Sequence, residues 1–195
     1  MTFNDLTPIY DFSQIPAAVQ AFFCAPTLKG PFVTPPPESD PNREPWFPAP
    51  GKIAFMTTLE ASLFQSPRPR VWVDDFAINE IKNFAVVDIN GTPRCNAWSG
   101  RMRLGILTDA SFEKHMALRS TILAIIPMLQ PVATPDGSGI AAGGINALLQ
   151  YHEVGQFSAV TMTPNITPAK DIYTSPIDIQ ITFSVRASFW DTLTA

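Results

Sequence analysis

The clearest alternation of hydrophobic and polar residues lies near the carboxyl end of the chain. From Ile177 to Ala187 every odd position is apolar, and the positions between hold Asp178, Gln180, Thr182, Ser184 and Arg186. Because successive side chains of a β-strand point to opposite faces, this alternation predicts a strand with one apolar and one polar face. A slip of one residue would exchange the two faces, so we expect the pairing register to be fixed.

A second strand with two different faces is predicted from Trp98 to Thr108. Its apolar face holds Trp98, Met102, Leu104 and Ile106, and its polar face holds Arg101 and Arg103. Upstream, residues 70–73 and 84–89 are apolar enough for two further strands. Asn90-Gly91 then offers the positive φ angles of a tight hairpin turn, so the chain is expected to reverse there.

Two helices are predicted in the first third of the chain. Residues 13–23 begin with a serine that can cap a helix, place Pro16 in the first turn, and continue with apolar residues at helical spacing. We expect the aromatic end of this helix to be buried. Thr57 and Glu60 match a capping box, which predicts a second helix over residues 57–65.

A third helix is expected after the Trp98–Thr108 strand. Asp109 or Ser111 can cap it. Pro127 predicts that it ends or kinks near Ile126. Its apolar stripe, which should lie on the sheet, comprises Phe112, Met116, Ile122, Leu123, Ile125, Ile126 and Leu129.

Two segments are predicted to be loops. Residues 30–51 contain eight prolines around Trp46 and Phe47, and such a stretch is expected to stay out of helices and sheet ladders. It is either a floppy insertion or an arm that lies on a neighbouring subunit, with the two aromatic residues as anchors. Residues 131–144 are rich in Gly, Ala and Pro, which predicts a mobile loop.

Length and composition favour a single soluble α+β domain over residues 1–195. Only 15% of the residues are charged, so part of the surface is either covered in an assembly or built from uncharged polar residues and the 20 prolines. The net charge of −4 gives no basic footprint for tight binding of DNA or an anionic membrane. Pro127 and Pro131 interrupt the longest uncharged stretch, which is too short to span a membrane.

Neither a metal site nor a cofactor site is predicted. The chain has two histidines, and His115 falls on the third helix as an expected solvated or half-buried residue. His152-Glu153 matches half of a zinc-protease motif, but Gln156 stands where the second histidine is required. The Gly137–Ala142 segment fits a loose dinucleotide fingerprint, but prolines and no strand lead into it.

Two sets of charged residues remain as candidates. Asp74, Asp75 and Asp178 could serve as acids or bases, although adjacent residues of a strand point apart and a solvated edge is the favoured interpretation. Arg101, Arg103 and Arg186 stand on the expected outward faces of two strands. They could form an interface patch for the carboxylates of a partner, or simply keep the sheet soluble and discourage edge pairing.

The order of these elements resembles the tail terminator proteins of long-tailed bacteriophages. The features that carry the resemblance are the strand from Trp98 to Thr108, a helix from about Ser111, the Leu-Leu-Gln-Tyr segment at 148–151, and a closing strand that ends at residues 185–190. The resemblance covers roughly residues 68–190 and rests on pattern and order. The proline-rich arm is longer than expected for the family, which keeps a related neck or head-completion protein open.

The resemblance implies a mixed, mostly antiparallel sheet with helices packed on one face, and a structural protein of the virion with no enzymatic activity and no cofactor. Such proteins form a ring, commonly a hexamer, that caps the tail tube and joins it to the head connector at the tail-neck junction. DNA would pass through the ring without tight binding, and the net charge favours a neutral or acidic lumen. A tail tube or baseplate protein is an alternative within the virion. An alternative of another class is a small-molecule-binding or hydrolytic domain that uses Asp74, Asp178 or His152.

Overall fold

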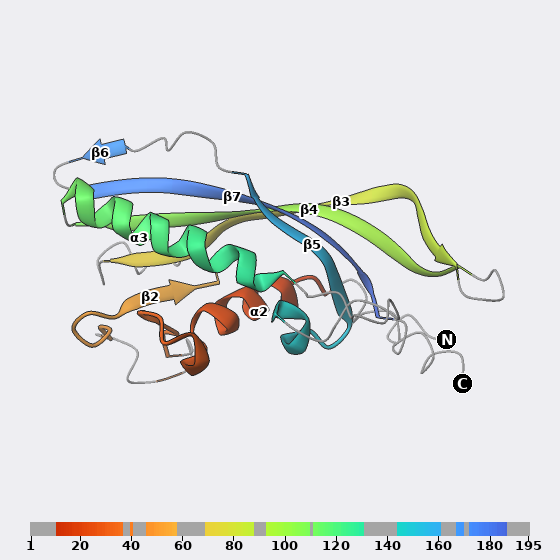
Figure 1. The fold of residues 1–195 in the computed structure, drawn as a ribbon, viewed down its shortest axis with the longest axis horizontal. Helices are drawn as coiled ribbons and strands as arrows, with labels where there is room; N and C mark the ends of the chain where they lie inside the picture. Colours follow the sequence, from red (N-terminus) through yellow and green to blue (C-terminus); the bar gives the residue numbers. More distant parts are fainter. Residues whose placement is uncertain are drawn as a thin grey trace.

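The computed structural model of the chain describes residues 11–36, 40, 46–57, 69–87, 93–109, 111–130, 144–160, 167–169 and 172–186. Within these residues, seven strands form one curled mixed sheet, and α-helices pack on one of its faces (Figure 1). The predicted helix over residues 57–65 and the segment over residues 131–144 lie outside the described residues, apart from Thr57 and Gly144.

The sheet has the strand order β1-β2-β3-β4-β7-β5, with β6 also beside β7. Strands β1 and β2 run parallel to each other, as do β2 and β3, and all the other pairs are antiparallel. The strands are β1 (Phe32–Val33), β2 (Ile53–Met56), β3 (Arg70–Val87), β4 (Pro93–Thr108), β5 (His152–Val160), β6 (Thr167–Ala169) and β7 (Ile172–Val185).

Two α-helices, α2 (Gln14–Phe23) and α3 (Phe112–Ile125), lie on the same side of the sheet (Figure 1). Three short 3-10 helices accompany them in the described part of the chain: η1 (Pro26–Leu28), η3 (Ile126–Leu129) and η4 (Gly144–Leu148). The expected α+β architecture, with helices on one face of a mostly antiparallel sheet, is therefore confirmed.

Strand β7 pairs with β4 on one side and with β5 and β6 on the other. The alternation predicted from its sequence is confirmed, because every odd-numbered side chain from 175 to 185 is buried. Ile177, Ile179 and Ile181 are at most 1% exposed, and they belong to the same core as Trp98 and Met102 of β4. The polar side chains between them face away from the helices.

Strand β3 is longer than predicted. Its sequence suggested two separate strands, but the structure has one strand, which pairs with β4 up to Glu80 and again from Ala85 to Val87. Register shifts follow Val73 and Glu80. Each shift inserts extra residues, which breaks the period of two that sequence analysis relies on. The predicted chain reversal is confirmed because Val87 pairs with Pro93, although Asn90 and Gly91 themselves are not among the described residues.

Helix α2 forms where expected and buries the aromatic Phe23 at its end. The predicted serine cap is wrong. Ser13 has helical backbone angles and its side chain caps no backbone N–H of the helix. Its hydroxyl instead donates to the carboxylate of Asp11. The start of the helix is fixed by packing, because Ile15, Ala18 and Val19 are buried against the sheet.

Helix α3 begins and ends as predicted, and Ile122, Ile125, Ile126 and Leu129 of its predicted stripe are buried in the core, but the start of the stripe is wrong. Ser111 accepts a hydrogen bond from the backbone N–H of Lys114, and the chain continues after Ile125 as the 3-10 helix that contains Pro127. Phe112, expected in the apolar stripe, is 50% exposed. The buried face consists of His115, Leu118, Arg119, Ile122 and Ile125.

Part of the proline-rich segment joins the sheet, against expectation. Phe32 and Val33 pair with Ile53 and Ala54 as the two-residue edge strand β1. Neither residue is a proline, so both keep a backbone N–H, and an edge position needs hydrogen bonds on one side only. Phe32 is buried against Phe23 and Phe55, which explains why this short piece is held in place.

A smaller apolar cluster lies on the face of the sheet opposite the main core. It contains Met56, Trp72 and Leu107, with Ile172 packed against it. The Trp72 indole covers Gly105 on the neighbouring strand, and its N–H donates to the Asp74 carboxylate at 3.0 Å. A Cβ atom at position 105 would lie 2.3 Å from two ring carbons of Trp72.

We therefore expect Gly105→Ala to destabilise the fold by about 1–3 kcal/mol, the usual cost of overpacking a filled site. Gly30→Ala is the matched control, because a Cβ there would meet its nearest neighbour at an ordinary 3.6 Å. Urea unfolding followed by tryptophan fluorescence measures both variants. Equal stability of the two variants would contradict the packing of Trp72 on Gly105.

Candidate interaction surface

The face of β3, β4, β7 and β5 that points away from α2 and α3 is called the outer face here. Beyond the Trp72 cluster its residues are mostly polar, apart from Ala77 beside Arg101, and lie in rows set by strand pairing. One row holds Asp75, Arg103 and Asp178, the next Arg101, Gln180 and Ser158, and the next Ser99 and Thr182. Ser158, Ser99 and Thr182 are short and uncharged, so these three side chains lose little conformational entropy when another surface covers them.

Arg103 and Asp178 form the tightest ion pair on the outer face. The Nε and Nη2 atoms of Arg103 donate to the two carboxylate oxygens of Asp178 at 2.8 and 3.3 Å. These hydrogen bonds lower the pKa of the Asp178 carboxyl and raise the pKa of the Arg103 guanidinium. A carboxylate held ionised in this way is poorly suited to be a general base near neutral pH.

Arg101 is held much more loosely. Its guanidinium lies 3.4 Å from the Asp75 carboxylate, and the two side chains are 49% and 47% exposed. Exposed ion pairs of this kind contribute about 0–1 kcal/mol, because water and salt screen the charges and two flexible side chains must be ordered. Arg101 can therefore change partners at little cost, whereas Arg103 cannot.

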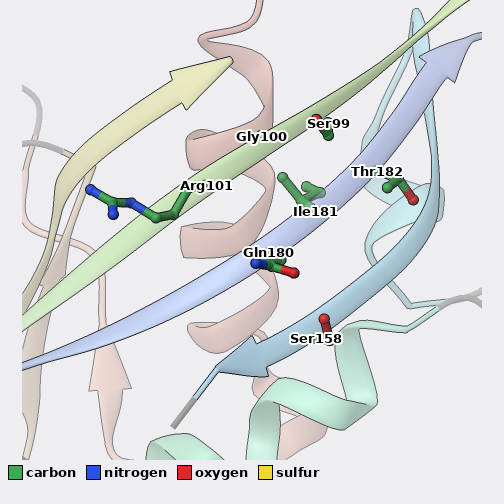
Figure 2. A pocket seen from close by; sticks show the side chains of 7 residues that line it. All are labelled: Ser99, Gly100, Arg101, Ser158, Gln180, Ile181 and Thr182. Carbon is green, nitrogen blue, oxygen red and sulfur yellow. The ribbon is translucent and has the colours of Figure 1, made fainter. Parts of the chain in front are cut away.

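A hollow of about 400 Å³ lies beside Arg101 on the outer face (Figure 2). Its lining comes from β4, β7 and β5, and consists of Ser99, Gly100, Arg101, Ser158, Gln180, Ile181 and Thr182. Three of these residues, Ser99, Thr182 and Ser158, carry short hydroxyl side chains beside the longer Arg101 and Gln180, which leaves space above the sheet. Figure 2 shows the Arg101 guanidinium directed toward β3, away from Ser158.

Arg186, predicted to share a patch with Arg101 and Arg103, lies elsewhere. Its Nε donates to the backbone carbonyl of His152 at 3.2 Å, and its Nη2 donates to the carbonyl of Asn146 in η4. The guanidinium thus joins the end of β5 to the helical layer. That part of the predicted patch is wrong, because Arg186 is held by the carbonyls of His152 and Asn146, and the second of these is in place only once η4 has packed against the sheet.

The two aromatic residues predicted as anchors differ in exposure. Phe47 is 59% exposed and Trp46 is half-buried. An exposed phenylalanine is available to a partner, so the prediction that Trp46 and Phe47 contact a neighbouring subunit stays a prediction.

Side-chain amides close part of the edge of β5. Asn146 accepts from the backbone N–H of Val154 at 2.7 Å and donates to its carbonyl at 3.0 Å. Gln130 accepts from the N–H of Phe157 at 2.7 Å and donates to the carbonyl of Gly155 at 3.0 Å. The two amides thus make the hydrogen bonds that a further strand would make along this stretch.

Residues that a hydrolytic or small-molecule site would need do not meet. Asp74 accepts from the Trp72 indole, and Asp178 is paired with Arg103 on the outer face. His152 is buried on the core side, where its ring contacts the rings of Phe12 and Phe183 at centroid distances of 5.5 and 5.8 Å. The alternative function based on these three residues therefore has no common site.

Sequence analysis did not find the buried polar cluster around His115. The expectation of a solvated or half-buried His115 is wrong, because the residue is 0% exposed. Its Nδ1 lies 3.0 Å from the Thr108 hydroxyl and its Nε2 lies 2.8 Å from the Ser175 hydroxyl. Ser175 is itself 3% exposed, so this serine and histidine have no access for a substrate and serve to join α3 to β4 and β7.

The chain matches no model of a protein family and no curated protein sequence. Among the described residues, no group of three His, Cys, Asp or Glu side chains could hold a metal ion. None of the helices in the described ranges has both the length and the apolar character that a membrane crossing requires.

The burial of His115 generates a prediction about pH. Burial, together with the nearby Arg119 guanidinium, lowers the pKa of His115 below its ordinary value of 6.5. The unfolded chain therefore binds a proton more readily than the folded one, and the stability contributed by neutral His115 is lost as the pH falls from about 7 to about 5. Asp178 has a lowered pKa, and the stability that this contributes is lost mainly as the pH falls toward and below the ordinary value of 3.8, which lies under this range.

We expect His115→Gln, which keeps a hydrogen-bonding side chain but does not titrate, to lose less stability than the wild-type chain over this pH range. Urea unfolding at about pH 7 and about pH 5 gives the two differences in the free energy of unfolding. Any contribution from His152 is common to both proteins and cancels. Equal differences for the two proteins would contradict a neutral, buried His115.

Proposed function

We propose that this chain is a structural protein of a phage virion, similar to the tail terminators of long-tailed phages. Copies of it form a ring, expected to be a hexamer, that caps the tail tube and joins it to the head connector at the tail-neck junction. DNA passes through the ring without being held. The observation that carries the proposal is the outer face, a broad and mostly polar surface on four strands, on which Arg101 and Arg103 are each paired with an aspartate.

The hairpin of β3 and β4 supports assembly independently. Strand β7 follows β4 only as far as Ala97, whereas β3 and β4 stay paired to Val87 and Pro93. Within the described residues, the end of the hairpin therefore consists of two strands that extend away from the body of the molecule (Figure 1). Two-stranded hairpins are marginally stable in water, so a neighbouring surface is expected to support this one.

The dispersal of Asp74, Asp178 and His152 favours a structural role over a hydrolytic or small-molecule-binding one, since catalytic groups have to converge. Another neck, head-completion, tube or baseplate role would use the same polar face and the same hairpin. We favour the terminator because the order of elements from the Trp98–Thr108 strand to the closing strand resembles that family.

Particle imaging of the purified protein, alone and mixed with tail tubes, tests the role. Free rings, or tubes whose ends are capped by the protein, are the expected result. Long tubes formed by the protein alone would indicate a tube subunit instead. Single copies at every concentration, together with uncapped tubes, would overturn the proposal.

Thr182→Lys tests whether the outer face is the assembly surface. Thr182 lies near the centre of this face, opposite Ser99, and a lysine there adds a charge and a long flexible side chain. We expect ring formation to require at least about tenfold more protein, which corresponds to about 1.4 kcal/mol of association free energy. Mass photometry over a concentration series measures the effect, and the melting temperature confirms folding.

Ala124→Lys is the matched control, because Ala124 is exposed on helix α3, on the other side of the sheet. This variant should assemble like the wild-type protein. If Thr182→Lys assembles as well as the control, the outer face is not the contact between copies.

A further inference from the structure

We propose that the hollow beside Arg101 binds a carboxylate-bearing side chain on an extended acidic segment of a neighbouring protein subunit. The site itself is formed by a single copy of this chain. Only the identity of its occupant, as another subunit of the same virion, rests on the proposed function.

The charge of the hollow points to a carboxylate. Arg101 carries the only charge among the seven residues that line it, and the other polar groups are the hydroxyls of Ser99, Ser158 and Thr182 and the amide of Gln180. A guanidinium presents paired N–H donors that match the two oxygens of a carboxylate. The hydroxyls and the amide can satisfy the backbone groups on either side of the bound side chain.

The size and openness of the site suit a segment of protein chain. A volume of about 400 Å³ falls in the range of about 300–1,000 Å³ typical of binding pockets, and the sheet around the hollow is polar. The lining offers no aromatic ring on which a sugar or a base could stack. An acidic side chain with its flanking backbone fits this combination of one cation and several uncharged donors and acceptors.

A nucleic acid fits the hollow poorly. Binding of a phosphate backbone gathers several Lys and Arg side chains, because each neutralised phosphate contributes to affinity. Here a single arginine is available, since Arg103 is committed to Asp178.

Asp75 competes with the incoming carboxylate for the guanidinium of Arg101. It holds the Arg101 guanidinium at β3 through a single long contact of 3.4 Å, and both side chains are about half exposed. An incoming carboxylate therefore displaces a weakly held partner and turns the guanidinium toward the hollow. Because the two carboxylates compete for Arg101, removing the charge of Asp75 should strengthen binding of the incoming carboxylate.

The test uses the full chain and a short peptide of Ser and Gly with one central Glu, labelled with an uncharged dye and followed by fluorescence anisotropy at low salt. A twin peptide with Gln in place of Glu is the control. We expect the Glu peptide to bind at least about tenfold more tightly than the Gln peptide, with this preference reduced at high salt. Arg101→Gln should remove the preference, and Arg101→Lys should keep part of it.

The decisive variant is Asp75→Asn, which should tighten binding of the Glu peptide about threefold, since exposed pairs compete weakly. A merely structural role of the Arg101–Asp75 pair would not improve affinity when the pair is broken. The proposal is overturned if Arg101→Gln keeps the preference for Glu, if Asp75→Asn weakens binding, or if a phosphoserine twin peptide binds more tightly than the Glu peptide.

The peptide-binding test and the test of ring formation can fail independently of each other. A preference for Glu in a protein that forms no rings would leave this site standing and overturn the proposed assembly. If the protein forms rings but shows no preference for Glu, the proposed carboxylate site is overturned and the proposed assembly stands.

Discussion

The constraint on which the rest of the structure depends is the fixed register of β7. Its odd-numbered side chains fill the core under α2 and α3, and its even-numbered side chains form part of the outer face. Because β7 pairs with β4 from Tyr173 to Ser184, the same register also sets which residues of β4 face the helices. A slip of one residue would bury Asp178 and Gln180 and expose four large apolar side chains, so core and surface are determined together.

Polar side chains then fix how the helical layer sits on this sheet. His115 and Arg119 are buried in the contact between α3 and β7, where they meet the Ser175 hydroxyl and the carbonyl of Pro176. Asn146 and Arg186 do the same for η4 at the other end of the molecule. Apolar packing alone would let a helix rotate on the sheet. These hydrogen bonds are directional, so they give the helices a defined orientation.

The parts of the fold that depend on local periodicity and turn chemistry could be predicted from the sequence. They include β7, the apolar face of β4, the reversal between Val87 and Pro93, and both ends of α3. Two of the parts that failed, the middle of β3 and the polar residues on the buried face of α3, depend on partners distant in sequence. The middle of β3 contains register shifts, and the buried face of α3 depends on acceptors about 60 residues away. At the candidate surface, the outward position of Arg101 was predicted, whereas the hollow results from pairing three strands.

The closure of β5 by Asn146 and Gln130 has a consequence for colloidal behaviour. A fibril that grows by strand addition needs two acceptor edges in every copy, one to join the stack and one to extend it. In this chain the N–H and carbonyl of Val154, the carbonyl of Gly155 and the N–H of Phe157 are already hydrogen-bonded to the amides of Asn146 and Gln130. Copies of the protein can therefore reach a high concentration while this route to amyloid-like stacking is blocked. The groups that block it are the side-chain amides of Asn146 and Gln130.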